Sequence, residues 1–248
     1  RFATKRDTTW YRFKNHKWEL TESGLELRAK IGTKMLNLFI NEEKDLTARV
    51  KIVEQNIDLK KAELGNDTKK IEADDAIQEN YKKMNDLLSW IKCYQDIQLK
   101  LQDLTFKKKI MEEAQSLFLE KDFEGKLDEN TQLLGFNNGV YQLHTGVFRD
   151  GKPNDYIFLS TEINYQVFPE DDPKICQIFA FLNQVFADPE LKVFELRDYV
   201  LKVISSFLEG LNPEERFYIW TGGGGNGKSK LLALIKSAFG KYARNIPA

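Results

Sequence analysis

The spacing of apolar residues divides the chain into a helical first half and a mixed second half. Apolar positions recur every three or four residues over residues 25–40 and again over 46–57, which predicts helices. The second of these segments has a regular packing seam formed by Leu46, Val50, Val53 and Ile57. Gly65 marks a break, after which residues 81–101 and 110–118 are predicted to form further helices.

The pattern changes near residue 130. Short β-type runs alternate with Asn-Gly and Thr-Gly turns, so residues 131–168 are predicted to form a small antiparallel β element. Helices return after Asp172-Pro173, a cap followed by a first-turn proline, and again after Asp188-Pro189. Gly210 is expected to end the second of these helices.

The last forty residues have a different organisation. The aromatic and β-branched run at 217–220 is typical of a buried strand, and residues 230–239 show a helical rhythm that ends at Gly240. The fold class predicted for the chain is mixed and predominantly α. It is a helical domain with a small antiparallel β element. Because residues 222–229 fit the phosphate-loop pattern G-x-x-x-x-G-K-[ST], the last part is predicted to be the first strand, loop and helix of an α/β ATPase core of the AAA+ type.

Three regions are expected from these changes of pattern. Residues 1–130 form a mainly helical region with an aromatic and basic start, residues 131–210 a small β element plus helices, and residues 211–248 the beginning of an ATPase core. The chain starts with Arg1 and stops soon after its glycine-rich loop, so we expect it to be a segment of a longer protein.

The aromatic and basic start has two interpretations. Two runs around Trp10 and Trp18 flank Asn15-His16, which predicts a hairpin turn. Interleaved cations and rings are typical of a nucleic-acid contact, whereas alternating aromatics are also typical of a packed core face. The packing interpretation is favoured.

Composition excludes several classes of protein. The 248 residues are 42% hydrophobic and 30% charged, with a net charge of −1, so the chain as a whole is no polycation. The two cysteines and two histidines are too few and too widely separated to predict a disulfide framework or a metal cluster. With no signal peptide and no apolar run approaching the roughly 18 residues that cross a bilayer, an intracellular protein without membrane contact is expected.

One motif in the sequence predicts a specific binding chemistry. Residues 222–229 read Gly-Gly-Gly-Gly-Asn-Gly-Lys-Ser and fit the loop that holds the phosphates of a nucleoside triphosphate. Glycines let the backbone turn its N–H groups toward an anion, and the N-terminus of the following helix adds its positive dipole end. The candidate nucleotide-binding residues are Gly222, Gly223, Gly224, Gly225, Asn226, Gly227, Lys228 and Ser229. Lys228 is the catalytic candidate, reaching the β- and γ-phosphates of ATP, and Ser229 is the ligand of Mg²⁺. The alternative is a glycine-rich turn that precedes Lys-Ser by chance.

Two other charged runs have structural interpretations. The lysines at 107–109 are expected to be a solvated helix edge, and the acidic residues at 170–172 to cap a helix rather than to bind a metal.

A family resemblance extends over most of the chain. Residues 135–141, 146–149 and 224–229 resemble the region that leads into the ATPase of the poxvirus-type primase-helicases, which are superfamily 3 helicases of large DNA viruses, phages and plasmids. Residues 10–13 and 16–18 resemble the start of that family's helicase-associated domain. The resemblance implies a collar-like domain up to about residue 210 and an ATPase core from about residue 211. It further implies a hexameric ring that hydrolyses ATP to move along DNA, at a viral replication site or in the host cytoplasm. The resemblance is compatible with a primase domain fused upstream, and it places the acidic magnesium residue, the sensor and the arginine finger after residue 248.

Two other functions compatible with the loop stay open. The parent is either this helicase or another phosphate-loop NTPase, such as a packaging motor or a kinase. Residues 1–210 taken alone are a candidate for a non-catalytic module that assembles the ring and guides DNA.

Overall fold

The computed structural model describes residues 2–6, 9–65, 68–186, 193–213 and 215–246. These residues form two compact units. The first unit contains residues 1–5, 10–20 and 120–248, and the second contains residues 6–9 and 21–119. The first twenty residues are therefore grouped mainly with residues more than 100 positions later. The domain boundaries expected near 130 and 210 stay predictions.

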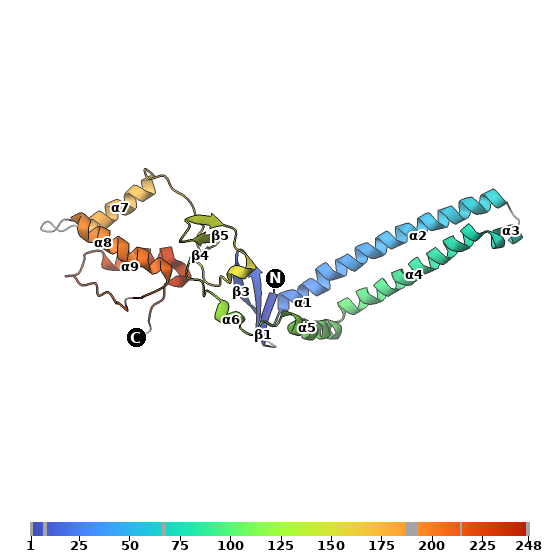
Figure 1. The fold of residues 1–248 in the computed structure, drawn as a ribbon, viewed down its shortest axis with the longest axis horizontal. Helices are drawn as coiled ribbons and strands as arrows, with labels where there is room; N and C mark the ends of the chain where they lie inside the picture. The colour runs from blue at the N-terminus through green and yellow to red at the C-terminus, as the bar shows by residue number, and fades with distance from the viewer. Residues whose placement is uncertain (1, 7–8, 66–67, 187–192, 214, 247–248) are drawn as a thin grey trace. The chain divides into compact units, whose positions relative to one another are not determined.

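The second unit is built from helices (Figure 1). They are α1 (Leu25–Lys30), the π-helical turn η1 (Ile31–Met35), α2 (Leu36–Leu64), α3 (Thr68–Ala73), α4 (Asp75–Gln102) and α5 (Leu104–Phe118). The helices predicted for this region are thereby confirmed, although α1, η1 and α2 follow one another directly instead of forming two separated helices. Across the described part of the chain, no helix is long and apolar enough to cross a membrane.

α2 and α4 lie side by side as an antiparallel hairpin (Figure 1). Val53 and Ile57 of the predicted seam are buried against Ile77 at the start of α4. Polar contacts also join the helices, because the side-chain amides of Gln95 and Gln98 both donate to the Glu43 carboxylate, each at 2.7 Å. Periodic apolar burial thus holds the hairpin together, as the seam predicted.

The first sheet has the strand order β1-β2-β3, from Phe2–Arg6, Thr9–Lys14 and Lys17–Glu22. Asn15 and His16 both have positive φ values, 48° and 65°, and form the predicted two-residue turn between β2 and β3. Such values suit the tight turns that match strand twist. The hairpin is confirmed, and β1 is a further strand that the sequence pattern did not reveal.

The aromatic start of the chain is a core face. Trp18 and Tyr11 are buried together with Phe123 of α6 (Phe123–Lys126), and the rings of Trp18 and Phe123 lie 4.8 Å apart at 79°. The Tyr11 hydroxyl donates to Glu124 at 2.8 Å, and the Trp18 indole donates to the carbonyl of Pro153 at 2.8 Å. The packing interpretation of these aromatics is confirmed.

The predicted antiparallel β element is confirmed over residues 133–149, whereas residues 150–168, also predicted to belong to it, contain no strand. Strands β4 (Leu133–Phe136), β5 (Gly139–Gln142) and β6 (Val147–Arg149) form an antiparallel sheet in that order. Leu134 pairs with Tyr141, which in turn pairs with Phe148. After the short helix η2 (Pro153–Asp155), residues 157–163 run beside β4, where Thr161 donates its backbone N–H to Gly135 and Asn137 donates to Ile163.

The remaining helices are α7 (Pro173–Val185), α8 (Val193–Ser206), η3 (Phe207–Glu209), α9 (Lys228–Phe239) and η4 (Gly240–Tyr242). Asp172 caps α7 by accepting from the backbone N–H of Lys174 at 2.8 Å, and Pro173 follows at the first position. The capping interpretation of the acidic triplet is thus confirmed, whereas the helix start predicted at Asp188-Pro189 lies outside the described residues.

The buried strand predicted at 217–220 is wrong for the described chain. These residues belong to no helix or sheet, and the side chains of Phe217 and Ile219 are 83% and 74% exposed. A strand exists only where a neighbouring backbone completes its hydrogen bonds, and no described segment pairs with this one. Composition favoured an extended conformation but could not supply the partner.

A pair of tryptophan substitutions tests where the core lies. Trp18 is 2% exposed and Trp90, on α4, is 57% exposed. We expect Trp18→Ala to destabilise the first unit by about 3–5 kcal/mol, because it removes a buried indole and leaves a cavity. The matched change Trp90→Ala is expected to cost no more than about 1 kcal/mol.

Hydrogen exchange of peptides around residues 123–127 and 156–160 measures the stability of the first unit separately from that of the α2–α4 hairpin. Unchanged protection of both peptides in Trp18→Ala would contradict the assigned core.

Candidate nucleotide-binding site

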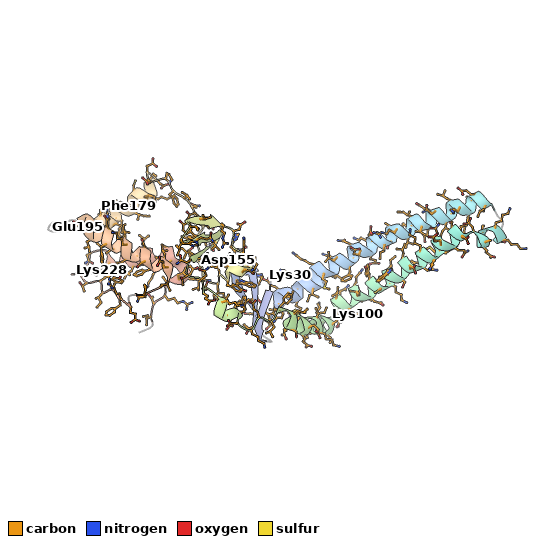
Figure 2. All side chains as sticks on the ribbon, viewed as in Figure 1. Lys30, Lys100, Asp155, Phe179, Glu195 and Lys228 are labelled. Carbon is orange, nitrogen blue, oxygen red and sulfur yellow. The ribbon has the colours of Figure 1, made fainter. Side chains whose placement is uncertain are left out.

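The glycine-rich loop lies directly before α9. Gly227 is the N-cap residue of this helix, and the Leu231 N–H donates to its carbonyl at 2.9 Å. Residues 222–226 are exposed, and Lys228 opens the helix (Figure 2). The predicted loop and helix are therefore present, with the helix N-terminus opening onto the loop as an anion site requires.

Three glycines of the loop have backbone angles that favour glycine. Gly224, Gly225 and Gly227 have φ values of 90°, 66° and 79°. At Gly227 there is a second reason for glycine, because a Cβ there would lie 2.7 Å from a methyl carbon of Val185 on α7. The final glycine thus serves both the turn and the packing of α9 against α7.

Lys228 folds back over the loop. Its ammonium donates to the Oδ1 atom of Asn226 at 2.6 Å, and a Cβ on Gly222 would lie 2.7 Å from the same nitrogen. Gly222 therefore leaves the space through which the lysine reaches back. Ser229 is exposed in the first turn of α9, with no hydrogen bond recorded for its hydroxyl in the part of the chain that the structure describes.

The residues present fit the triphosphate of a nucleotide. A Cβ at Gly223, Gly224 or Gly225 would meet no atom within 4 Å, so the space over the loop is open. Within the described ranges, no hydrogen bond is recorded from the loop amides of residues 222–227. A cation, open backbone donors and a helix N-terminus together form a site for an anion.

The opposite end of α9 is attached to the β element. The Lys241 N–H donates to the Ser160 carbonyl at 3.0 Å, and the Tyr242 hydroxyl donates to the Leu159 carbonyl at 3.0 Å. The same hydroxyl accepts the Gly135 N–H at 3.0 Å. Gly240 packs so closely on the backbone of Thr161 that a Cβ would overlap it. These contacts fix the position of the helix that carries the candidate site.

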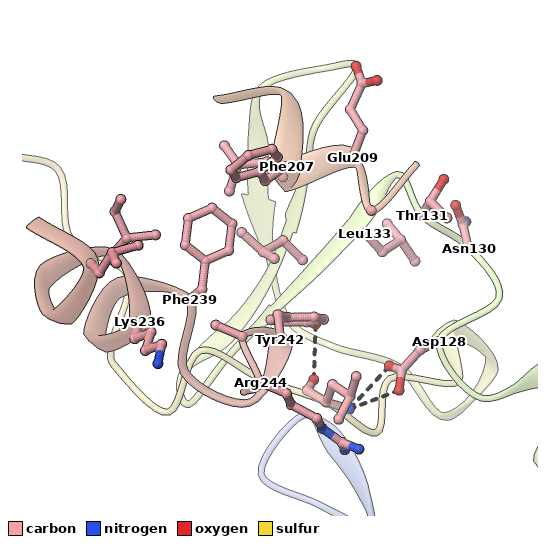
Figure 3. A pocket seen from close by; sticks show the side chains of 17 residues that line it. Asp128, Asn130, Thr131, Leu133, Phe207, Glu209, Lys236, Phe239, Tyr242 and Arg244 are labelled. Carbon is pink, nitrogen blue, oxygen red and sulfur yellow. Dashed lines mark hydrogen bonds between the residues drawn. The ribbon is translucent and has the colours of Figure 1, made fainter. Parts of the chain in front are cut away.

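A cavity of about 500 Å³ lies beside this attachment, at the end of α9 remote from the glycine loop (Figure 3). Apolar side chains of β4, η3 and α9 line it, with Asp128 and Tyr242 at its edge. Asp128 accepts the backbone N–H groups of Phe158 and Leu159. Burial raises the pKa of its carboxyl despite these bonds, and burial raises the pKa of the Tyr242 phenol from 10.0 to about 12. None of residues 222–229 lines this cavity, so the cavity is separate from the candidate phosphate site.

Sequence reasoning placed all eight loop residues, 222–229, in one continuous site, and the structure keeps them together. It did not identify Val185 or Tyr242, which position the loop and α9. Neither residue stands in a motif, and both act through contacts with chain segments more than 40 residues away, so no local signal marks them.

The chain is similar in sequence to viral proteins that are named putative helicase or putative primase. A protein of Acanthamoeba polyphaga mimivirus named "Putative helicase L207/L206" is 33% identical over 96% of this chain and 22% of its own length. "Putative helicase 184R" of Invertebrate iridescent virus 6 is 33% identical over 64% of the chain and 16% of its own. "Putative primase C962R" of African swine fever virus is 27% identical over 61% and 16%.

Residues 1–187 match the family described as "D5 N terminal like". The chain belongs to this family, and the resemblance to poxvirus-type primase-helicases is confirmed. It spans about a fifth of the length of the curated relatives it matches.

Removing the Tyr242 hydroxyl tests the attachment of α9. Tyr242→Phe leaves the Gly135 N–H without its acceptor, and we expect a loss of about 1–3 kcal/mol in the stability of the first unit. Tyr218→Phe is the control, since Tyr218 is 39% exposed and has no hydroxyl bond recorded among the described residues.

The pH dependence of unfolding checks the same group. The pKa of the phenol is raised to about 12 in the folded state. Its contribution to the free energy of unfolding is therefore complete below pH 10.0 and is lost as the pH rises toward 12. Tyr242→Phe should reduce the loss of stability at alkaline pH. It should not abolish this loss, because the pKa of Tyr11 is also raised to about 12 and Tyr11 contributes in the same way. An unchanged alkaline profile in urea unfolding would contradict the assignment.

Two glycine substitutions test the loop geometry. Gly227→Ala meets both a positive φ and the Val185 methyl, so we expect about 1–3 kcal/mol of local destabilisation. Gly223→Ala meets no atom within 4 Å and should have little effect. Hydrogen exchange of the first turn of α9 measures the difference, and equal exchange in the two variants would be inconsistent with the loop described.

Proposed function

We propose that the chain supplies the phosphate-binding loop and the preceding D5 N-terminal region of an ATP-dependent DNA helicase of superfamily 3. The observation that carries the proposal is the loop at residues 222–227, open above its glycines and followed at once by Lys228 and α9. Relatives named helicase and primase support the choice of a replication enzyme. The ring of subunits, expected to be a hexamer, and the movement along DNA belong to the proposal for the full-length protein.

Each residue of the loop has a role in this proposal. The amides of residues 222–227 receive the phosphate oxygens, and α9 adds the positive end of its dipole. Lys228 is held in place by Asn226 and exchanges this partner for the β- and γ-phosphates of ATP. The Ser229 hydroxyl, exposed beside it, is the ligand for Mg²⁺. Bound Mg²⁺–ATP supplies the hydrolysable phosphate bond.

The family membership favours this function over a packaging motor or a kinase, since the loop alone is shared by all three. For residues 1–210 taken alone, assembly of the ring and guidance of DNA stay a proposal. It is compatible with the absence of any group of three metal-ligating side chains from the described residues.

Two lysine substitutions in the full-length protein test the proposal. Lys228→Ala should weaken ATP binding by about 10–150-fold and abolish DNA-stimulated hydrolysis and unwinding, because a charged contact to phosphate is worth about 1.5–3 kcal/mol. Lys230→Ala removes the same charge from an exposed position two residues later and should retain activity.

Calorimetry measures the binding, and phosphate release with and without single-stranded DNA measures hydrolysis. Wild-type rates in Lys228→Ala would refute the assigned site. ATP-dependent phosphorylation of a small molecule, with no response to DNA, would identify the kinase alternative instead.

A further inference from the structure

We propose that a cationic patch in the helical unit binds the phosphate backbone of DNA without reading its bases. This α5 patch consists of Arg28 from α1, Lys100 from the last turn of α4 and Lys107, Lys108 and Lys109 from α5. The choice of DNA as the partner rests on the proposed function. The geometry of the patch is independent of the glycine loop, which belongs to the other unit.

Packing between helices brings the cations together. α5 contacts α1 and α4, with Met111 and Ala114 on its buried side. Lys107 extends over the π-helical turn η1, where its ammonium nitrogen lies 3.4 Å from the position that a Cβ on Gly32 would take. Arg28 precedes Gly32 by four residues and so lies on the same side of the helix, one turn away. Lys107 is therefore placed by apolar packing of α5 and by the missing side chain of Gly32, and Arg28 lies one turn earlier on α1.

The carboxylates of Glu112 and Glu113 follow Lys108 and Lys109 by four residues on α5. Within the described residues, none of the five cations of the patch has an ion pair within 4.0 Å. The nearby Asp103 carboxylate is engaged as the N-cap of α5, where it accepts the Phe106 N–H at 2.7 Å. Lys100, Lys108 and Lys109 are exposed, and Figure 2 shows Lys100 near the end of α4, where the chain turns toward α5. An anion from outside the unit would relieve the repulsion among these groups.

The charge of the patch contrasts with that of the hairpin beside it. Residues 36–99 contain 10 Lys and Arg against 13 Asp and Glu, so the hairpin is net negative. The positive charge is concentrated at its base, as expected for a local contact with a polyanion rather than for a uniformly solvated surface.

The chemistry of the patch favours a phosphate backbone. Four of the five cations are lysines, which act as flexible point charges and suit the repeated phosphates of a nucleic acid. The patch contributes no aromatic ring on which a base could stack, so the contact is expected to be independent of sequence. Its affinity should therefore depend strongly on salt and weakly on base composition.

Matched lysine pairs test the patch in the complete 248-residue chain, without nucleotide. Fluorescence anisotropy with a labelled oligonucleotide of about 30 nucleotides gives the affinity between about 50 and 200 mM salt. Lys108→Ala/Lys109→Ala should reduce affinity at least about tenfold and lower the salt slope by up to about 1.4, which corresponds to two lost contacts to a single strand. Lys82→Ala/Lys83→Ala removes the same charge from an adjacent exposed pair on α4 and should change affinity by less than about twofold.

A second pair of variants acts on the patch without removing any cation. Gly32→Glu places a carboxylate beside Lys107 and should weaken binding, whereas Gly32→Gln, of similar size, should not. Circular dichroism confirms that the helices persist in both.

Three outcomes would overturn the proposal: no DNA binding by the wild-type chain, equal losses in the two lysine pairs, or binding to anionic lipid vesicles in place of DNA. Failure of the glycine-loop proposal is distinguishable, because Lys228→Ala should leave this nucleotide-free DNA binding unchanged.

Discussion

The hydrogen-bond requirement of one largely buried segment, residues 157–161, links several parts of the first unit. Ile157, Ser160 and Thr161 are at most 3% exposed, so their backbone groups need partners within the protein. The partners come from several parts of the chain: the Trp18 N–H in the first sheet, the Asp128 carboxylate, the Gly135 carbonyl in the second sheet and the Tyr242 hydroxyl after α9. A buried backbone group left without a partner costs about 1–3 kcal/mol. The segment therefore fixes the positions of all four of these hydrogen-bonding partners.

This constraint gives the glycine loop a defined support. A phosphate site needs its backbone donors held in place before the anion arrives, since ordering them on binding would reduce affinity. The end of α9 is fixed by Lys241 and Tyr242, and its beginning packs through Gly227 on Val185 of α7. The loop therefore projects from a helix that is restrained at both ends, while the glycines at 223–225 stay open to solvent.

The helical unit uses a different kind of stabilisation. Its hairpin depends on the periodic seam between α2 and α4, with Val53, Ile57 and Ile77 buried. The glycine loop lies in the first unit, and the lysines at 107–109 lie in the helical unit. Membership of the D5 N-terminal-like family, shown over residues 1–187, covers the whole helical unit and the β element.

Local sequence determined those features whose physics is local. The helix seams, the turn at Asn15-His16 and the cap at Asp172 depend on residues within a few positions of each other, and so does the glycine loop at 222–229. Only the tertiary structure decided which partners these elements meet. Trp18 packs on Phe123, 105 residues later, and the run at 217–220 forms no strand because no described backbone pairs with it. The periodicity of apolar residues predicts that a side chain will be buried or that a backbone will be extended. The identity of the partner depends on chain folding between distant segments, which no local pattern specifies.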